Sequence, residues 1–514
     1  MTLDRIPPEI LEYIAYLVAT DDLLGPPQHL IPLLLANRKI HSTLSSVSNP
    51  HLYASIFEAK FDVCLAKKRL GEHRLTPKVL ARELQRRMVL LKRIYGLSGS
   101  TDPSAHDNPQ EQEQGTEDVV DEVLLTAYLM MLENQGRNHS QLRDYAQISK
   151  WLRYFWFHER GRSAAISSVR KGEWPSNTTR TALGMWLFWF FMKPDEYPGG
   201  GDAIESPISI LKVQAMGAHK YPLSEIPWAD YQPNSGPTSA QEITWYGQTL
   251  PFIPPPLAIP AILSYLAFTN RRRSLPLTPS DPTIPESPSR DEWSADWGRA
   301  VLMGDPSQPR SVKSCFSLGS IEGVWEGFFT YTEFTTYAGV LRGAPPQILQ
   351  KGLVGKHQQT WKLREHHLLS ADDDPNPVTT PLGHGDPLRS YIPNGTKLVE
   401  HQGGVKVHEP GRDVALEYTR AGAVTRSDNK VVDIIITGEG HSAWGQFSLV
   451  GRVRPCDGFI SLSKDYVDGD RGKWLYRGYL AGNVYGNFVG RWRDTLTLSL
   501  FPGYEGCFAM SRRR

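Results

Sequence analysis

The sequence predicts an α+β protein, with a helical N-terminal half and a C-terminal antiparallel β-barrel-like domain. Up to about residue 270, apolar residues recur every three or four positions, which is the period of an amphipathic helix. After about residue 315, glycine becomes frequent and short runs alternate between apolar and polar residues, as β-strands do. Two stretches, 98–118 and 273–312, are rich in polar residues or proline and are predicted to be linkers.

The first 62 residues are predicted to form three short helices. Pro7 and Pro8 lie at the start of the first helix, where proline has a suitable φ and loses no hydrogen bond. Glu9 follows in the first turn, where the helix dipole favours a negative charge. The second and third helices are expected within residues 30–45 and 49–62. Because three such helices cover little of one another, part of their apolar surface must be covered by something else.

Residues 63–97 are predicted to contain one amphipathic helix, and residues 119–272 a helical region. The first has Leu80, Leu84, Met88 and Leu91 on one face. The helical region holds the two longest apolar runs of the chain, 182–192 and 257–268. Both are well short of the roughly 20 residues that span a bilayer, so we expect two buried helices.

Residues 313–514 are predicted to form the β-barrel-like domain. Runs such as GQFSLVGRV (445–453) and KWLYRGYL (473–480) follow one another closely, with Gly, Asp and Asn between them. This spacing favours an antiparallel meander over βαβ units. A closed barrel is expected because it leaves no edge strand exposed. The alternation places Trp474, Tyr476 and Phe508 on the inner face.

The composition excludes several classes of protein. The chain of 514 residues carries a net charge of +1, so as a whole it is not built to bind nucleic acid or an acidic membrane surface. Its four cysteines are far apart and predict neither a zinc site nor a disulfide framework. Acidic residues interrupt the first twenty positions, where a secretory signal would be apolar. A reducing location, cytoplasmic, nuclear or both, is therefore expected.

Three local patterns could bind a ligand, but simpler interpretations are favoured. His366 and His367 are adjacent, and neighbours on a strand face opposite ways, so they seldom share one metal ion. The three aspartates in KDYVDGDRG (464–472) miss the spacing of a calcium loop and predict a turn, with positive φ at Gly469 and Gly472. The basic stretch 64–96 is typical of a solvated helix face, although nucleic-acid binding or a nuclear signal stays open. No catalytic motif, cofactor or metal site is predicted.

The first 62 residues resemble an F-box. The resemblance rests on Ile6-Pro7-Pro8-Glu9-Ile10-Leu11, then on 34–40 (LLANRKI) and on 49–57 (NPHLYASIF). Ile6 replaces the usual Leu, and residues 20–29 lengthen the first loop. The resemblance implies that these helices dock on the Skp-type adaptor of a cullin ubiquitin ligase; the alternative is a structural cap. The residues that it assigns to adaptor contact are Ile6, Pro7, Glu9, Ile10, Leu11, Ile14, Leu17, Leu34, Leu35, Ile40, Leu52, Ile56 and Phe57.

The C-terminal domain resembles the β-domain of some F-box proteins, fungal ones in particular, which is described as lipocalin-like. The similarity lies in Gly323-x-Trp325-x-Gly327 and in the closing Gly490-Arg491-Trp492. Aromatic side chains, which give large contact areas at recognition surfaces, are the candidate target-binding residues, although for any one of them a place in the barrel core is the favoured interpretation. They are Trp325, Phe329, Phe334, Tyr337, Trp444, Trp474, Tyr476 and Trp492.

Together the two resemblances imply a non-catalytic substrate-receptor subunit of a Skp/cullin/F-box ubiquitin ligase. Its partners would be the adaptor, through it a cullin, and a target protein held by the β-domain; neither nucleic acid nor a membrane is expected. Such a subunit acts by proximity and needs no catalytic residue. The alternative is a lipocalin-like protein that binds or senses a small molecule and carries an N-terminal interaction module. A cavity in the barrel would favour that alternative, whereas a packed barrel with an aromatic mouth would favour protein recognition.

Overall fold

The computed structural model describes residues 6–99, 113–197, 206–233, 239–270, 291–304, 312–370, 380–422, 431–469, 471–483 and 485–513. The chain divides into two compact units. The first consists of Met1–Phe155, Ile243–Leu250 and Pro285–Asp291, and the second of Trp156–Glu242, Pro251–Ile284 and Glu292–Arg514. Each unit therefore contains segments that are far apart in the sequence.

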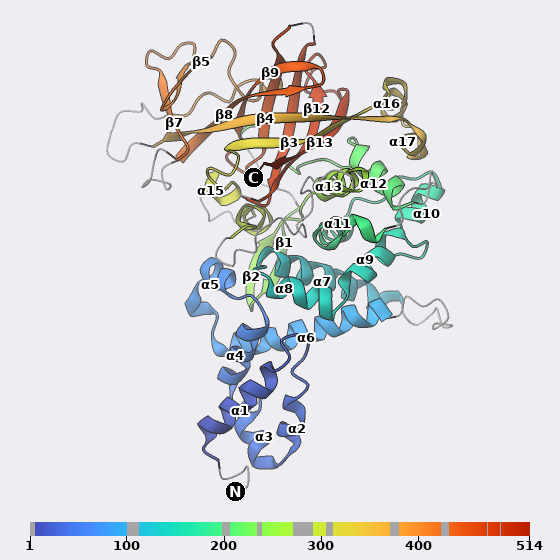
Figure 1. Cartoon of the computed structure of the whole chain (residues 1–514), viewed down its shortest axis with the longest axis vertical. Coiled ribbons are helices and arrows are strands. Elements are labelled where there is room, and N and C mark those ends of the chain that lie inside the picture. The colour runs from blue at the N-terminus through green and yellow to red at the C-terminus, as the bar shows by residue number, and fades with distance from the viewer. Residues whose placement is uncertain are drawn as a thin grey trace. The chain divides into compact units, whose positions relative to one another are not determined.

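The first unit is helical, and its elements are labelled in Figure 1. Four short helices come first: α1 (Pro8–Thr20), α2 (Leu30–Leu35), α3 (Arg38–Leu44) and α4 (Pro50–Lys60). The remaining helices are α5 (Cys64–Leu70), η2 (Glu72–Arg74), α6 (Pro77–Gly99), α7 (Glu113–Leu132), α8 (Arg137–Ser140) and η3 (Gln141–Tyr145), followed by α9 (Ile148–Phe157). The expected linker 98–118 is shorter than predicted, because α6 continues to Gly99 and α7 begins at Glu113. Residues 100–112 lie outside the described residues.

The second predicted helix is two helices in the structure, α2 and α3. Asn37 interrupts it with an extended backbone, and its side-chain oxygen accepts a hydrogen bond from the Ile40 amide at 2.8 Å. An N-cap of this kind satisfies an orphan donor at the start of a helix, so it favours a new helix over continuation of the old one. Asn49 caps α4 in the same way, accepting from the Leu52 amide at 3.0 Å.

The core of the first unit contains a buried ion pair. Arg87 of α6 donates to Glu133, with 3.1 Å between Nη2 and Oε2, and both side chains are fully buried. Two strands, β1 (Gln241–Trp245) and β2 (Gln248–Phe252), form a hairpin whose side chains contact this pair. Trp245 Nε1 donates to Glu133 at 2.7 Å, and Arg87 donates to the Tyr246 hydroxyl at 2.8 Å. The guanidinium also lies 5.0 Å from the ring centre of Phe57 in α4. This contact ties the N-terminal helices to α6.

The helices of the second unit include the two long apolar runs. They are α10 (Ala165–Arg170), α11 (Thr179–Phe191), η4 (Pro194–Glu196), α12 (Pro207–Met216), α13 (Ala258–Thr269), α14 (Ser294–Trp297), η5 (Gly298–Leu302) and α15 (Val312–Cys315). The prediction of buried helices is confirmed, since α11 and α13 are buried almost throughout. Within the described part of the chain, no helix is long and apolar enough to cross a membrane. The predicted linker 273–312 was too long, because α14, η5 and the start of α15 lie inside it; residues 271–290 and 305–311 are outside the described residues.

The C-terminal part forms a closed antiparallel barrel of eight strands (Figure 1). Its strands are β3 (Gly323–Thr332), β4 (Val354–Leu369), β8 (Val431–Ser442), β9 (Gly445–Val453), β10 (Ile460–Tyr466), β11 (Lys473–Ala481), β12 (Asn487–Asp494) and β13 (Glu505–Arg512). The order β3-β13-β12-β11-β10-β9-β8-β4 closes through pairing of β3 with β4. The prediction of a closed antiparallel barrel is confirmed, and both quoted runs are strands, β9 and β11.

Shorter helices and strands connect or extend the strands of the barrel. The helices α16 (Phe334–Leu341) and α17 (Gln347–Lys351) connect β3 to β4. A three-stranded sheet of β5 (Lys397–His401), β6 (Gly404–His408) and β7 (Leu416–Arg420) continues from the far end of β4, where β7 pairs with His366 and His367. The short helix η6 (Pro387–Arg389) precedes it. Helices α12 and α13 lie against the outer face of the barrel at β13, and α13 also contacts β11 and β12.

Aromatic rings fill the middle of the barrel. The ring centre of Trp361 lies 5.2 Å from that of Tyr476 and 5.9 Å from that of Phe508, and the latter two are 5.0 Å apart. The inward position of Tyr476 and Phe508 is thus confirmed, as both are buried in this core. Trp474 is only partly buried and packs against the edge of the same core. Ring contacts at these distances are stabilising and leave the centre of the barrel well packed.

Candidate functional site

One end of the barrel carries a group of aromatic side chains, some buried and some partly exposed, which we call the mouth. This end is formed by the last residues of β3, β8, β10 and β12 and the first residues of β4, β9, β11 and β13. Trp444, in the β8–β9 turn, lies 5.2 Å from Phe329 and 5.0 Å from His357 between ring centres. Trp474 and Tyr504 contact Trp492 edge-on at 5.2 and 5.4 Å. The mouth therefore combines exposed ring edges with a rigid aromatic base.

The structure brings together most, but not all, of the predicted aromatic site residues. Phe329, Trp444, Trp474 and Trp492 belong to the mouth, and Phe334 and Tyr337 of α16 join it through Tyr504, with ring centres 5.7 and 5.1 Å away. Trp325 and Tyr476 do not belong to it. Trp325 is buried near the opposite end, where its Nε1 donates to the Ile321 carbonyl at 2.8 Å, and Tyr476 lies in the middle of the core.

A buried lysine lies just inside the mouth. Lys464 of β10 is almost completely buried, and its Nζ donates to Gln359 Oε1 at 3.2 Å. Its ammonium faces the rings of Phe447, Tyr466, Phe329 and Tyr476, with the nearest ring centre 3.8 Å away. Burial lowers the pKa of Lys464 to about 7. Ring faces attract a cation, but they compensate for lost hydration less fully than a carboxylate would.

The loop that joins β12 to β13 forms one side of the mouth. Residues 495–504 (TLTLSLFPGY) contain no charged side chain, and four large apolar residues project from them. The exposed fractions are 94% for Leu496, 62% for Leu498, 87% for Leu500 and 59% for Phe501. We call residues 495–504 the apolar loop. Sequence reasoning missed it, because its alternation of leucine with Thr and Ser is typical of a strand; the absence of charge was the signal that could have distinguished it.

The predicted adaptor-binding residues divide between the surface and the core of the first unit. Those that are exposed are Pro7, Glu9, Ile10, Leu17 and Leu35, and those that are partly buried are Ile6, Ile14 and Leu34. Buried ones are Leu11, Ile40, Leu52, Ile56 and Phe57. On α1, Ile10, Tyr13 and Leu17 share one face at helical spacing and are all exposed. The buried members of the predicted set belong to the core of the helical unit, and only the exposed members are available to a partner.

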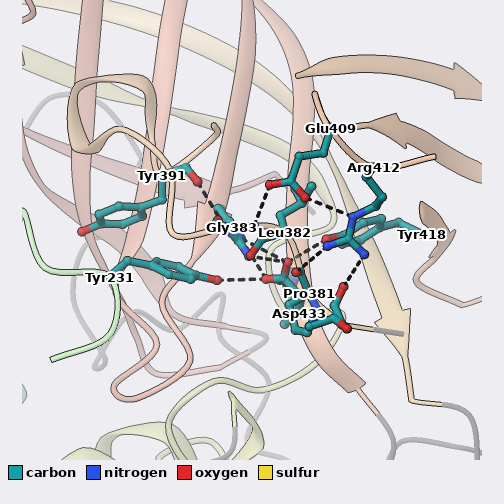
Figure 2. Close-up of polar contacts among 12 residues, drawn as sticks. Tyr231, Pro381, Leu382, Gly383, Tyr391, Glu409, Arg412, Tyr418 and Asp433 are labelled. Atoms are coloured by element: carbon teal, nitrogen blue, oxygen red, sulfur yellow. Dashed lines mark hydrogen bonds and ion pairs between the residues drawn. The ribbon is translucent and has the colours of Figure 1, made fainter. Parts of the chain in front are cut away.

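Figure 2 shows the most extensive buried polar network that we describe, and it is structural. Asp433 of β8 accepts hydrogen bonds from the hydroxyls of Tyr231 (3.0 Å) and Tyr418 (2.7 Å) and pairs with Arg452 Nη2 at 2.8 Å. Arg452 also donates to the carbonyls of Leu382, Gly383 and Tyr391. Since these charged groups are used within the network, they fasten the segment 382–391 to the barrel wall and leave little capacity for a ligand.

The remaining local predictions concern histidines and aspartates. His366 Nε2 pairs with Thr437 Oγ1 at 2.9 Å, whereas His367 Nε2 pairs with Glu365 at 2.6 Å, so the two rings have different partners. Burial lowers the pKa of His366 to about 4. Gly469 and Gly472 have positive φ, as predicted for the turn after β10. Within the described residues, no group of three or more potential ligands is placed to hold a metal ion.

We compared the chain with protein-family models, with curated proteins and with solved structures, and none of them matches it.

Proposed function

We propose that this chain is the substrate-receptor subunit of a Skp/cullin/F-box ubiquitin ligase. In this proposal the N-terminal helices bind the Skp-type adaptor, and the mouth of the barrel binds a target protein. The observation that carries the proposal is the set of exposed apolar side chains on the first two helices. These are Ile10, Tyr13 and Leu17 on α1, and Ile31 and Leu35 on α2.

The exposed residues favour a docking role for α1. A helix that only capped its own unit would turn its apolar residues inward, as Leu11, Ala15 and Ala19 do. Ile10, Tyr13 and Leu17 instead point to solvent on a second face. Large apolar groups gathered on one helix face are typical of an interaction surface. They follow the Ile-Pro-Pro-Glu start that resembles an F-box, with Pro7 at the N-cap of α1.

The barrel supports protein recognition better than the alternative of a small-molecule carrier. A carrier needs an internal cavity. Here Trp361 and Phe508 contact each other across the middle of the barrel, and both rings also contact Tyr476 and Phe488. Accessible apolar groups, Leu500 and Phe501 among them, lie at the mouth, where a protein could cover them. The subunit would then act in the cytoplasm, the nucleus or both, by holding a target near the conjugating enzyme, without catalytic residues or a cofactor.

The proposal can be tested on α1. We expect the double substitution Pro7→Ala, Ile10→Ala to weaken binding of a purified Skp-type adaptor by about ten- to a hundredfold. Pro7 sets the start of the helix, and burying a side chain such as Ile10 is worth roughly 1.5–3 kcal/mol. The measurement is titration calorimetry of the full chain with the adaptor, beside thermal unfolding of both variants.

The matched control is Val89→Ala, which shortens another exposed apolar side chain of the same unit, on α6. We expect this variant to bind the adaptor normally. Adaptor binding that is absent in the wild-type chain, or unchanged by the double substitution, would return α1 to the role of a structural cap.

A further inference from the structure

The apolar loop is held in one conformation by the two residues that precede it. The Asp494 carboxylate accepts hydrogen bonds from the amides of Leu496 (3.0 Å), Thr497 (2.7 Å) and Tyr504 (2.7 Å). Burial by itself would raise the pKa of Asp494, but the hydrogen bonds from Thr497 and from the Tyr504 amide stabilise its charged form and lower the pKa overall. The carboxylate therefore bridges both ends of the loop.

Arg493 donates hydrogen bonds to backbone carbonyl groups of the same loop. Its Nη2 lies 2.8 Å from the Thr497 carbonyl oxygen, 3.3 Å from that of Leu498 and 3.4 Å from that of Phe501. The Tyr337 hydroxyl donates to the Gly503 carbonyl at 2.8 Å. A Cβ at Gly503 would lie only 2.6 Å from Asp494 Oδ2 and 2.7 Å from Arg493 Nη2. A side chain at this position would therefore have to displace the ends of Asp494 and Arg493, which together we call the clamp.

The clamp lowers the free-energy cost of burying the loop against a partner. Backbone groups that already have partners within the protein lose little when water is removed. A loop that is already ordered also loses little conformational entropy on binding. The residues that project, Leu496, Leu498, Leu500 and Phe501, gain from leaving water. The base of the loop is equally firm, because Tyr504 contacts Trp492 and Phe334, with ring centres 5.4 and 5.7 Å away.

We propose that the apolar loop is the main target contact, and that it inserts into an apolar recess on the surface of a folded target protein. This inference rests on the proposed function and names the chemistry of its target. Side chains that project from a rigid loop fit a concave surface. Because the loop has no charged residue and its flanking ions are used inside the clamp, the recess must be uncharged at its centre, as the core of a protein interface usually is.

Charge decides between a protein and a lipid surface as the partner. Binding to an anionic membrane usually combines apolar insertion with free basic side chains close by. Arg493 is held inside the clamp, and a second basic residue next to the loop is Lys473, whose carbonyl accepts from Thr495 Oγ1 at 3.2 Å. Its Nζ pairs with Asp465 at 2.9 Å, so its charge is already balanced. A protein recess therefore fits the surroundings of the loop better than a membrane does.

The test places a photo-crosslinking amino acid in the full chain at Leu500, with a control at exposed Val399 on β5. The cross-linked protein is identified by mass spectrometry, purified, and titrated with the chain. We expect Leu496→Ser, Leu498→Ser to weaken this binary complex by about tenfold or more, and Val399→Ser to leave it unchanged. Gly503→Ala, which displaces the loop while keeping its side chains, should weaken it as well.

Several outcomes would overturn the inference: a lipid adduct at position 500, an adduct with a second copy of the chain, the same adduct from position 399, no protein adduct, or a binary complex that the serine variants bind equally well. Adaptor binding by each variant is measured in parallel. If adaptor binding is intact and the loop prediction fails, only the inference about the loop is wrong. If the wild-type chain does not bind the adaptor, the proposed function itself fails.

Discussion

Lys464 places a basic side chain on the apolar wall of the barrel. Its neighbours on the inner face of β10 are Ile460, Leu462 and Tyr466, all buried. Among the described residues its one hydrogen-bond partner is Gln359, and no carboxylate pairs with it. Burying the charged form without an anion is costly, which is why its pKa falls to about 7 from the usual 10.5.

This pKa predicts a stability that depends on pH. Between about pH 7 and 10.5 the unfolded chain keeps a proton on Lys464 that the folded barrel has released, so stability rises with pH across that window. We expect Lys464→Met to remove this slope and to raise the free energy of unfolding at pH 7 by up to about 5 kcal/mol, since one pKa unit corresponds to about 1.4 kcal/mol. Denaturant unfolding at pH 7, 8.5 and 10 measures both effects.

Lys473→Met is the control for this experiment, because Lys473 is exposed and paired with Asp465. It should change stability by less than about 1 kcal/mol at every pH. A destabilised Lys464→Met variant, or one with the same pH slope as the wild type, would show that the ammonium is compensated better than the structure indicates.

At the scale of single residues, strand alternation predicted inward-facing side chains correctly where both neighbours along the face are apolar. Tyr476 and Phe508 are examples. The same alternation, in the run ISLSKDY (460–466), places Lys464 on the inner face. Lysine is so rarely buried, however, that its residue type predicts an exposed side chain. Whether an aromatic residue lies at the mouth or in the core could not be predicted, because that depends on how far along the barrel axis each strand begins.

Among the elements, the segment that precedes β1 is fastened to the outside of the barrel by arginines. Arg491 donates to the carbonyls of Tyr221 (2.6 Å) and Ala215 (3.1 Å), and Arg454 to those of Pro227 (2.8 Å) and Asp230 (2.9 Å). We call residues 215–231 the strap. Tyr231 ends it and joins the network around Asp433. The GRWR sequence of β12 thus has a structural role on the outer face, where alternation places Arg491.

We predict that Asp433→Asn destabilises the barrel by about 3–5 kcal/mol. The change leaves Arg452 buried without an anion, which is the costly way to break a buried pair. Glu439→Gln is the matched control, since the Glu439 side chain is 54% exposed, and it should cost about 1 kcal/mol or less. Guanidinium unfolding followed by tryptophan fluorescence compares the two, and equal effects would contradict a structural role for the network.

At the same scale, the strands, the buried helices and their order were predicted from periodicity, whereas the apolar loop was not. Its leucines alternate like those of a strand, yet Asp494 and Arg493 take the backbone groups that a strand would offer to its neighbours. The division between α2 and α3 was missed for a similar reason, since one cap at Asn37 outweighs a continuous apolar pattern. Side chains that bond to the backbone can override periodicity.

At the scale of the whole molecule, the chain passes between the two units several times. The first unit includes Ile243–Leu250, which follows almost ninety residues of the second unit in the sequence. This hairpin segment supplies Trp245 and Tyr246 to the buried pair of Arg87 and Glu133. A simple series of domains joined by linkers, as periodicity suggested, therefore misses a long-range connection that only tertiary contacts can reveal.

This arrangement predicts how fragments behave. A fragment of residues 1–155 lacks the hairpin, so Glu133 and Arg87 lose partners and the rings that cover them. We expect it to be less stable, by about 3 kcal/mol or more, than the same fragment with residues 241–252 attached through a flexible linker, because unpaired buried polar groups are costly. Circular dichroism melting compares the two fragments, with Trp245→Ala, Tyr246→Ala in the longer one as the control that should abolish the gain. If residues 1–155 alone melt cooperatively at the temperature of the longer fragment, the hairpin is dispensable and the helical unit folds without the long-range connection.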